Sequence, residues 1–244
     1  MPQSGNLNRC LVIIPAYNEV ASIADVIKGL FQTIPDFDVI VIDDGSIDGT
    51  AAAVPEGADV IRLPFNLGIG GAMQTGYRYA AIHGYDLAIQ VDGDGQHLPS
   101  EVLKLVDHLK KNNLDMVIGS RFIEPGSYKQ SFTRMIGIYL LRVVLFSLTA
   151  GRIITDCTSG FRAVNRNVIN CFAHWYPEDY PEPEVVLLLI RSGFNLAEVP
   201  VEMAQRYGGK TSISFWRGVF YTIKVSAALF LDMIRDPWTN RKLY

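Results

Sequence analysis

Three features are scarce in this 244-residue chain: cysteine, excess positive charge and long uncharged apolar runs. Its three cysteines, Cys10, Cys157 and Cys171, are widely spaced, so we expect no disulfide framework and no cysteine metal site, as in a reducing cytoplasm. A formal net charge of -3 excludes nucleic-acid binding through overall basicity. No run of about 18 uncharged apolar residues occurs, so we expect no transmembrane helix. The short polar segment 1–8 predicts no signal peptide.

Apolar residues make up 49% of the chain, and in its first half they form short runs that alternate with helical patterns. These patterns predict strands at 9–15, 38–42, 58–63, 86–91 and 115–119 and helices at 19–31, 68–83 and 99–111. Because the strands are apolar throughout and separated by helices, they predict a parallel sheet covered on both faces. The second half predicts helices at 131–149, 182–191 and 215–234 and a strand at 194–203.

Two carboxylates, Asp92 and Asp94, stand where the fourth apolar run stops, and a glycine follows each of them. In an extended strand, residues i and i+2 project to the same side, so we expect these side chains to converge. Carboxylates that close repel each other unless a cation lies between them, and all-oxygen ligands suit Mg²⁺ or Mn²⁺. Taken alone, the segment could also be a plain Asp-Gly turn.

Three further strand ends carry polar or glycine-rich segments, at 15–19, 43–50 and 66–72. Each alone could be a helix cap or a tight turn. However, the carboxyl ends of parallel strands meet at one edge of the sheet, where ligands bind, so their joint placement predicts a nucleotide site. The acids at 43–44 would accept hydrogen bonds from a ribose or base, and the glycines at 68–71 would let the backbone approach the ligand. The ion would neutralise a diphosphate leaving group.

Seven motifs in this order and spacing resemble the family 2 glycosyltransferases, and among them the polyprenyl-phosphate sugar synthases. They are Pro15-Ala16-Tyr17-Asn18-Glu19, Asp43-Asp44-Gly45-Ser46, Asn66-Leu67-Gly68, Asp92-Gly93-Asp94, Gly119-Ser120-Arg121-Phe122, Thr158-Ser159-Gly160-Phe161-Arg162 and Arg206-Tyr207-Gly208-Gly209-Lys210-Thr211-Ser212. The resemblance covers about residues 9–212. It implies an α/β GT-A fold, Rossmann-like with a mostly parallel sheet, in a catalytic domain 1–212. It also implies inverting sugar transfer from a nucleotide-diphosphate sugar.

The resemblance implies a role for individual side chains as well. The nucleotide-sugar pocket would be lined by Pro15, Tyr17, Glu19, Asp43, Asp44, Asn66, Gly68, Asp92 and Gly93. The metal ligands would be Asp92, Asp94 and Gln96, and the phosphate-binding cations would be Arg121, Arg134, Arg206 and Lys210. The catalytic candidates are Asp94, Arg121, Glu184 and Arg206.

The chain departs from the family pattern in two places. Gly68 and Ile69 stand where a lysine often follows the asparagine of the glycine-rich turn, so one donor cation is missing or supplied elsewhere. The segment 182–185 stands where many inverting members place a Glu-Asp pair. Glu184 aligns best with the catalytic base of those members, but it could also be an acid favoured by the dipole of a helix N-terminus.

The acceptor stays open between two chemical classes. A hydroxyl of a growing lipid-linked glycan or polysaccharide would need a base, Glu184 or Asp179, to take its proton. A polyprenyl phosphate is already anionic and needs only cations to steer it, and we favour this acceptor. Two less favoured alternatives are nucleotidyl transfer, which would need a basic glycine-rich loop after the first strand, and a scaffold that binds a nucleotide without turnover.

The C-terminal segment 213–244 is predicted to be an amphipathic helical tail. One face of its helix collects the apolar residues Phe215, Trp216, Val219, Phe220, Ile223, Ala227, Phe230, Leu231 and Ile234. The opposite face collects Arg217, Tyr221, Lys224, Ala228, Asp232 and Arg235. Such a helix could lie in a bilayer interface, or pack on the domain or on a second copy of the chain. The segment 135–150 could be a second such element. We therefore expect an enzyme at the inner face of the cell membrane, with a small membrane partner protein or a homo-oligomer also open.

Overall fold

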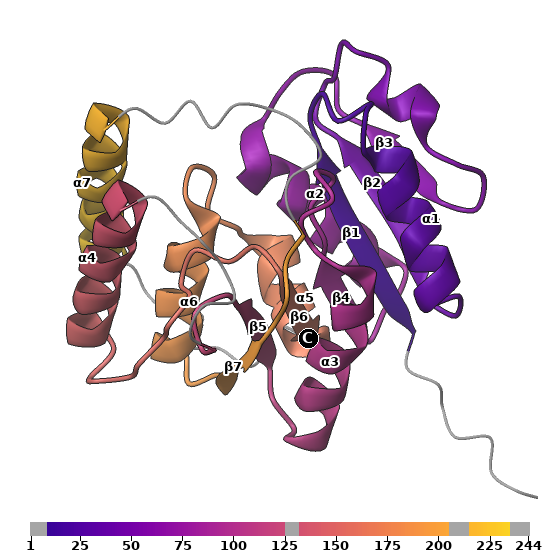
Figure 1. Ribbon diagram of the computed structural model, residues 1–244. Helices are drawn as coiled ribbons and strands as arrows, with labels where there is room; N and C mark the ends of the chain where they lie inside the picture. The colour runs from indigo at the N-terminus through magenta and orange to yellow at the C-terminus, as the bar shows by residue number, and fades with distance from the viewer. Residues whose placement is uncertain (1–8, 125–131, 205–214, 235–244) are drawn as a thin grey trace, which may run out of the picture.

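The computed structural model describes residues 9–124, 132–204 and 215–234, with the side chains of the last two ranges described from 135 and 222 onward. A seven-stranded sheet in the order β3-β2-β1-β4-β6-β5-β7 forms its centre (Figure 1). The strands are β1 Cys10–Ala16, β2 Asp38–Asp43, β3 Asp59–Arg62, β4 Leu87–Gln90, β5 Met116–Ser120, β6 Arg162–Asn165 and β7 Leu196–Pro200. Neighbouring strands are parallel except where β6 pairs with β4 and β5. The predicted mostly parallel α/β sheet is confirmed.

Helices cover both faces of this sheet, as its apolar strands require. They are α1 Ile23–Thr33, α2 Gly68–Ile82, α3 Pro99–Lys111, α4 Phe132–Leu148, α5 Arg166–His174, α6 Pro181–Arg191 and α7 Phe215–Asp232, with a 3-10 turn η1 at Thr50–Ala53. Alternate residues of β1 enter different cores: Leu11 and Ile13 pack with α2, α5 and α6, while Val12 and Ile14 pack with α1 and α3. Burial on both faces therefore explains the unbroken apolar run.

One strand and one α-helix, β6 and α5, were not predicted, nor was the short turn η1. β6 has four residues and begins at Arg162 inside a polar motif, so it is too short to show an apolar period. α5 begins directly after it, where the Asn165 side chain caps the helix by accepting a hydrogen bond from the Val168 amide at 3.1 Å. The strand predicted at 194–203 is also shorter, since β7 ends at Pro200.

Helices α4 and α7 lie side by side at one edge of the molecule and pack against each other (Figure 1). Leu141 and Leu145 of α4 and Val225 and Leu229 of α7 enter the larger core. The outward residues form an exposed apolar face, defined as Met135, Ile136, Tyr139, Leu140, Val143 and Phe146 of α4 with Ile223, Phe230, Leu231 and Ile234 of α7 and the turn after it. Within the described ranges, no helix is both long and apolar enough to cross a membrane.

The structure corrects one detail of the predicted tail. Asp232 was expected on its polar face with exposed charged residues, but it is buried, and Arg191 of α6 donates a hydrogen bond to its carbonyl at the end of α7. The apolar residues of the predicted face that the structure describes are exposed, including Ile223, Phe230 and Ile234. The boundary predicted at 212/213 lies outside the described residues.

Candidate active site

The segments that follow β1, β2 and β4 are joined by hydrogen bonds at one edge of the sheet. The Asp44 amide donates to the Ala16 carbonyl at 2.9 Å, and the Glu19 amide donates to the Thr50 hydroxyl at 2.9 Å. The Ser22 hydroxyl donates to the Gly93 carbonyl at 2.7 Å. The strand ends that the sequence singled out therefore do meet at the carboxyl edge of the sheet, with Pro15 buried and Tyr17 exposed in the first segment.

Asp44 orders the glycine-rich turn that follows β3. Its side chain is buried, and its two oxygens accept hydrogen bonds from the amides of Leu67 at 2.7 Å and Gly68 at 2.9 Å. The Asn66 side chain accepts a second hydrogen bond from the Gly68 amide at 3.1 Å. Because Gly45 adopts a φ of 72° and a Cβ there would lie 2.9 Å from the Asn66 nitrogen, only glycine lets these two turns meet.

Asp43, the other acid after β2, is also buried. Its Oδ1 accepts a hydrogen bond from the Ser46 amide at 3.1 Å, and its Oδ2 lies 3.4 Å from the Nε atom of Arg62. The two neighbouring carboxylates thus order the loops of the predicted nucleotide pocket from within.

The predicted acid pair lies in a turn after β4 and not on the strand itself. The alternation of side chains along a strand was therefore the wrong reason to expect the two carboxylates to converge. β4 ends at Gln90, and Asp92 and Asp94 follow in the turn, both half-buried, with the buried Gly93 between them. Asp94 accepts a hydrogen bond from the Gln96 amide at 3.0 Å. Asp92 accepts one from the Gln90 side chain at 3.2 Å. The turn, held by these hydrogen bonds, sets the positions of both carboxylates.

This turn offers a donor set that fits a hard divalent cation. No cluster of three or more histidine, cysteine or acidic ligands exists within the described ranges, so the turn would supply the two carboxylates of Asp92 and Asp94. Two half-buried carboxylate groups leave coordination positions for water and phosphate oxygens, as Mg²⁺ and Mn²⁺ sites commonly do. Gln96 is half-buried beside them.

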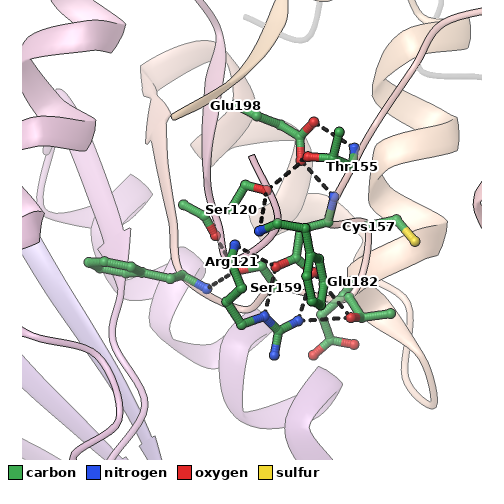
Figure 2. A network of polar contacts seen from close by, with 12 residues as sticks. Ser120, Arg121, Thr155, Cys157, Ser159, Glu182 and Glu198 are labelled. Atoms are coloured by element: carbon green, nitrogen blue, oxygen red, sulfur yellow. Dashed lines mark hydrogen bonds and ion pairs between the residues drawn. The ribbon is translucent and has the colours of Figure 1, made fainter. Parts of the chain in front are cut away.

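Arg121, predicted as a phosphate-binding cation, is buried and paired with Asp156 (Figure 2). Its Nε and Nη2 atoms donate to the two oxygens of the Asp156 carboxylate, both at 2.7 Å, and its backbone amide donates to Oδ2 at 3.0 Å. Nη2 also donates to the Thr158 hydroxyl at 2.9 Å. Asp156 has no exposed surface. Such a bidentate pair fixes the guanidinium plane.

A second carboxylate, Glu198 of β7, fixes the loop that carries Asp156. It accepts hydrogen bonds from the amides of Thr155 at 2.6 Å and Asp156 at 2.7 Å. The Thr155 hydroxyl donates to Glu198 at 2.9 Å and lies 2.8 Å from the Ser120 hydroxyl (Figure 2). β5 and β7 therefore hold Arg121 through a network that the sequence did not reveal.

Arg162 joins this network to the N-terminus of α6. Its side chain is buried, its Nε donates to the Ser159 carbonyl at 2.8 Å, and its Nη2 donates to the Glu182 carbonyl at 2.7 Å. Burial raises the pKa of the half-buried Glu182 carboxyl, an effect that the charge of Arg162 opposes and that of Asp92 reinforces. Glu182 is therefore within electrostatic reach of Asp92 in the acid turn.

The other predicted bases and cations have different surroundings. Glu184 is buried within the first turn of α6, and Asp179 is exposed and bonded to Lys224 of α7 at 3.0 Å. The side chain of Arg134 lies outside the described residues, as do Arg206 and Lys210 entirely. The catalytic and binding roles assigned to these residues stay predictions.

The comparison of sequences decides the family. The sequence model of the family described as glycosyl transferase family 2 matches residues 11–172. The chain belongs to glycosyl transferase family 2.

Two relatives and one solved structure place this glycosyltransferase more closely. The polyprenol monophosphomannose synthase of Mycolicibacterium smegmatis is 28% identical over 225 residues, which span 84% of this chain and 81% of that protein. The undecaprenyl-phosphate mannosyltransferase of Micrococcus luteus is 29% identical over 215 residues, 84% of this chain and 88% of that protein. Glucosyl-3-phosphoglycerate synthase from Mycobacterium tuberculosis, crystallised with Mn²⁺, uridine diphosphate and phosphoglyceric acid, superposes with a TM-score of 0.69 at 22% identity, covering 92% of this chain and 78% of that one. This likeness confirms the GT-A fold.

One arginine of the glycosyltransferase was not predicted as a site residue, because it stands within an otherwise apolar helix. Arg142 of α4 lies over the ring of Phe122, 4.8 Å from its centroid, and the Arg121 guanidinium lies 5.4 Å from the same centroid. The Nε atom of Arg142 is buried and, among the described residues, has no hydrogen-bond partner. An arginine within an otherwise apolar run was the available signal. Phe122 thus lies against two guanidinium groups, one from β5's loop and one from α4.

Proposed function

We propose that this glycosyltransferase moves a sugar from a nucleotide-diphosphate sugar to a polyprenyl phosphate, with inversion and with Mg²⁺ or Mn²⁺, at the inner face of the cell membrane. One observation carries the proposal: α4 exposes apolar residues outward and brings Arg142 inward to Phe122, which also contacts Arg121. A lipid phosphate needs both features together, an apolar surface for its chain and cations for its head group. The names of the two mannose-transferring relatives agree with such an acceptor.

The donor would lie along the carboxyl edge of the sheet. Asp92 and Asp94 would hold the divalent cation, whose charge favours departure of the nucleotide diphosphate. Tyr17, Asn66 and the turn ordered by Asp44 would contact the nucleoside and sugar, since they border the same edge. The Mn²⁺ and uridine diphosphate in the M. tuberculosis enzyme agree with this arrangement.

The acceptor phosphate would react without a protein base. One of its oxygens would form a bond to the anomeric carbon as the bond from that carbon to the donor diphosphate breaks on the opposite side, which inverts the configuration. A phosphate monoester is already ionised at neutral pH, so no proton needs to be removed. Arg121 and Arg142 would orient it, together with the predicted cations Arg134, Arg206 and Lys210.

The exposed apolar face supplies the membrane contact in this proposal. Its ten side chains lie on two helices that pack together and on the turn after α7, and a monomeric soluble protein rarely exposes so many large apolar residues there. Lipid tails would cover these side chains while the sheet and its site stay in water. A small membrane protein or a second copy of the chain would be other occupants of the same face.

A second candidate function is transfer to a sugar hydroxyl, and Glu182 is the observation that favours it. Its carboxyl has a raised pKa and is electrostatically coupled to Asp92, as a general base near the acid turn would be. The base predicted from the sequence, Glu184, lies two residues farther into α6 and is buried. Replacing each by glutamine would show which of the two carboxylates, if either, takes a proton.

The test is radiolabelled transfer from a panel of nucleotide sugars to undecaprenyl phosphate, with Mn²⁺ and with EDTA. We expect a metal-dependent product in the organic phase that Asp94→Ala abolishes and that Glu182→Gln and Glu184→Gln retain. Metal-dependent donor hydrolysis without a lipid product would overturn the lipid-phosphate acceptor. Loss of transfer in Glu182→Gln alone would contradict the reaction without a protein base.

A further inference from the structure

We propose that His97 is a positioning residue that holds both the backbone and the carboxylate of Asp92. The inference rests on the proposed function in one respect, the role of Asp92 as a metal ligand. It assigns His97 no contact with the substrate. The buried His97 ring sets the direction of the Asp92 side chain before any ligand binds.

The two ring nitrogens of His97 face the same residue. Nδ1 accepts a hydrogen bond from the Asp92 amide at 2.9 Å, so in the neutral ring the proton resides on Nε2. Nε2 lies 3.7 Å from the Asp92 Oδ2 atom. One ring nitrogen therefore fixes the Asp92 backbone, while the other lies near one oxygen of the Asp92 carboxylate. In histidines, the partner of one ring nitrogen commonly fixes both the tautomer and the orientation of the ring.

The His97 ring is itself held tightly. Its side chain is 4% exposed and stacks on the buried Phe161 ring, with centroids 4.6 Å apart and planes 14° apart. A Cβ on Gly119 would lie 2.9 Å from Phe161, so the glycine gives Phe161 its place. His97 also pairs with Met203 in an isolated antiparallel bridge. These contacts leave the ring little freedom to turn away from Asp92.

The other carboxylate oxygen of Asp92 has a restraint of its own. Gln90, the last residue of β4, donates to Oδ1 at 3.2 Å. Gly160 lies against both: a Cβ there would come within 2.7 Å of the Gln90 side-chain nitrogen and 3.4 Å of Asp92 Oδ1. Gln90 and His97 thus lie at different oxygens of the Asp92 carboxylate. The Asp92 side chain is 37% exposed, so a ligand can still reach it. Loss of such outer contacts commonly costs 10–100-fold in metal affinity.

The test measures Mn²⁺ binding to the full chain by electron paramagnetic resonance, with Mn²⁺ alone as the probe and without donor or lipid. His97→Phe keeps the stacking on Phe161 but removes both polar contacts, and we expect it to weaken Mn²⁺ binding by about 10–100-fold. His97→Asn keeps an acceptor for the Asp92 amide, and we expect it to recover part of that loss. His83→Phe, on an exposed histidine that follows α2, is the matched control and should bind Mn²⁺ as the unchanged protein does.

The outcomes separate this inference from the proposed function. If the unchanged protein binds no Mn²⁺, the metal role of Asp92 fails and the inference fails with it. If the unchanged protein and His97→Phe bind Mn²⁺ equally, only the inference is overturned. Melting temperatures are measured in parallel, and should His97→Phe not fold, His97→Asn decides: equal affinity in that variant also overturns the inference. A higher donor KM at a similar kcat would support positioning of the metal and donor.

Discussion

Replacing Asp156 by asparagine removes the counter-ion of a buried guanidinium and leaves the shape of the side chain almost unchanged. Asp156 has no exposed surface and Arg121 is 7% exposed, so water cannot take over the lost interaction. The change also replaces one of the two oxygens that accept hydrogen bonds from the guanidinium at 2.7 Å with an NH2 group, which cannot accept. Removing one partner of a buried ion pair typically costs about 3–5 kcal/mol.

We expect Asp156→Asn to lower the free energy of unfolding by about that amount, which corresponds to a melting temperature roughly 6–20 °C lower in a chain of this size. Urea unfolding followed by circular dichroism would measure it. Asp107→Asn is the matched control, since its pair with Lys111 is exposed and such a pair contributes about 0–1 kcal/mol. Equal stability of Asp156→Asn and Asp107→Asn would refute the reasoning that the Arg121 pair holds this side of the site.

Three further predictions concern the pocket, the pH dependence and the membrane face. Asp44→Ala leaves the Leu67 amide without its acceptor and the Gly68 amide with the Asn66 side chain alone, so we expect about 1–3 kcal/mol lower stability and a higher donor KM, measured by urea unfolding and initial rates. Because burial raises the pKa of Glu182 in the folded state above its ordinary value, stability should fall as pH rises from about 4.5 through the raised pKa. Glu182→Gln should remove this part of the pH dependence of stability. If the variant and the unchanged protein show the same pH profile of unfolding, the prediction is contradicted. Replacing Tyr139 and Phe146 by serine should weaken binding to anionic vesicles about tenfold or more in a sedimentation assay, whereas Ile82→Ser, at a still more exposed residue of α2, should not.

The elements that could be predicted are those whose sequence reports burial directly. β1 and β2 are unbroken apolar runs because both faces of these strands are covered, and α3 begins at Pro99 with a proline in its first turn and matches its predicted bounds. β6 could not be predicted, because its strand identity comes from antiparallel pairing with β4 and β5 and not from its own four residues.

The placement of polar groups was harder to predict than the strands. Aspartates after a strand were recognised as important, yet the sequence could not show that Asp44 turns inward to two amides. Nor could it show that Arg121 pairs with a carboxylate 35 residues farther along the chain. Glu182 and Glu184 are two residues apart on one helix, and only the packing of α6 shows that Glu182 senses the charge of Asp92. Such pairings depend on tertiary contacts that no local pattern encodes.

The most direct test of the account compares undecaprenyl phosphate with undecaprenol as acceptors in one assay, using the unchanged protein and Arg142→Met. The two lipids differ only in the phosphate, so they isolate the group that the cations beside Phe122 would bind. The account predicts transfer to the phosphate alone, and for Arg142→Met a higher KM for that lipid with the donor KM unchanged. Transfer to undecaprenol at a comparable rate, or an Arg142→Met variant that uses the lipid phosphate as well as the unchanged protein does, would contradict it.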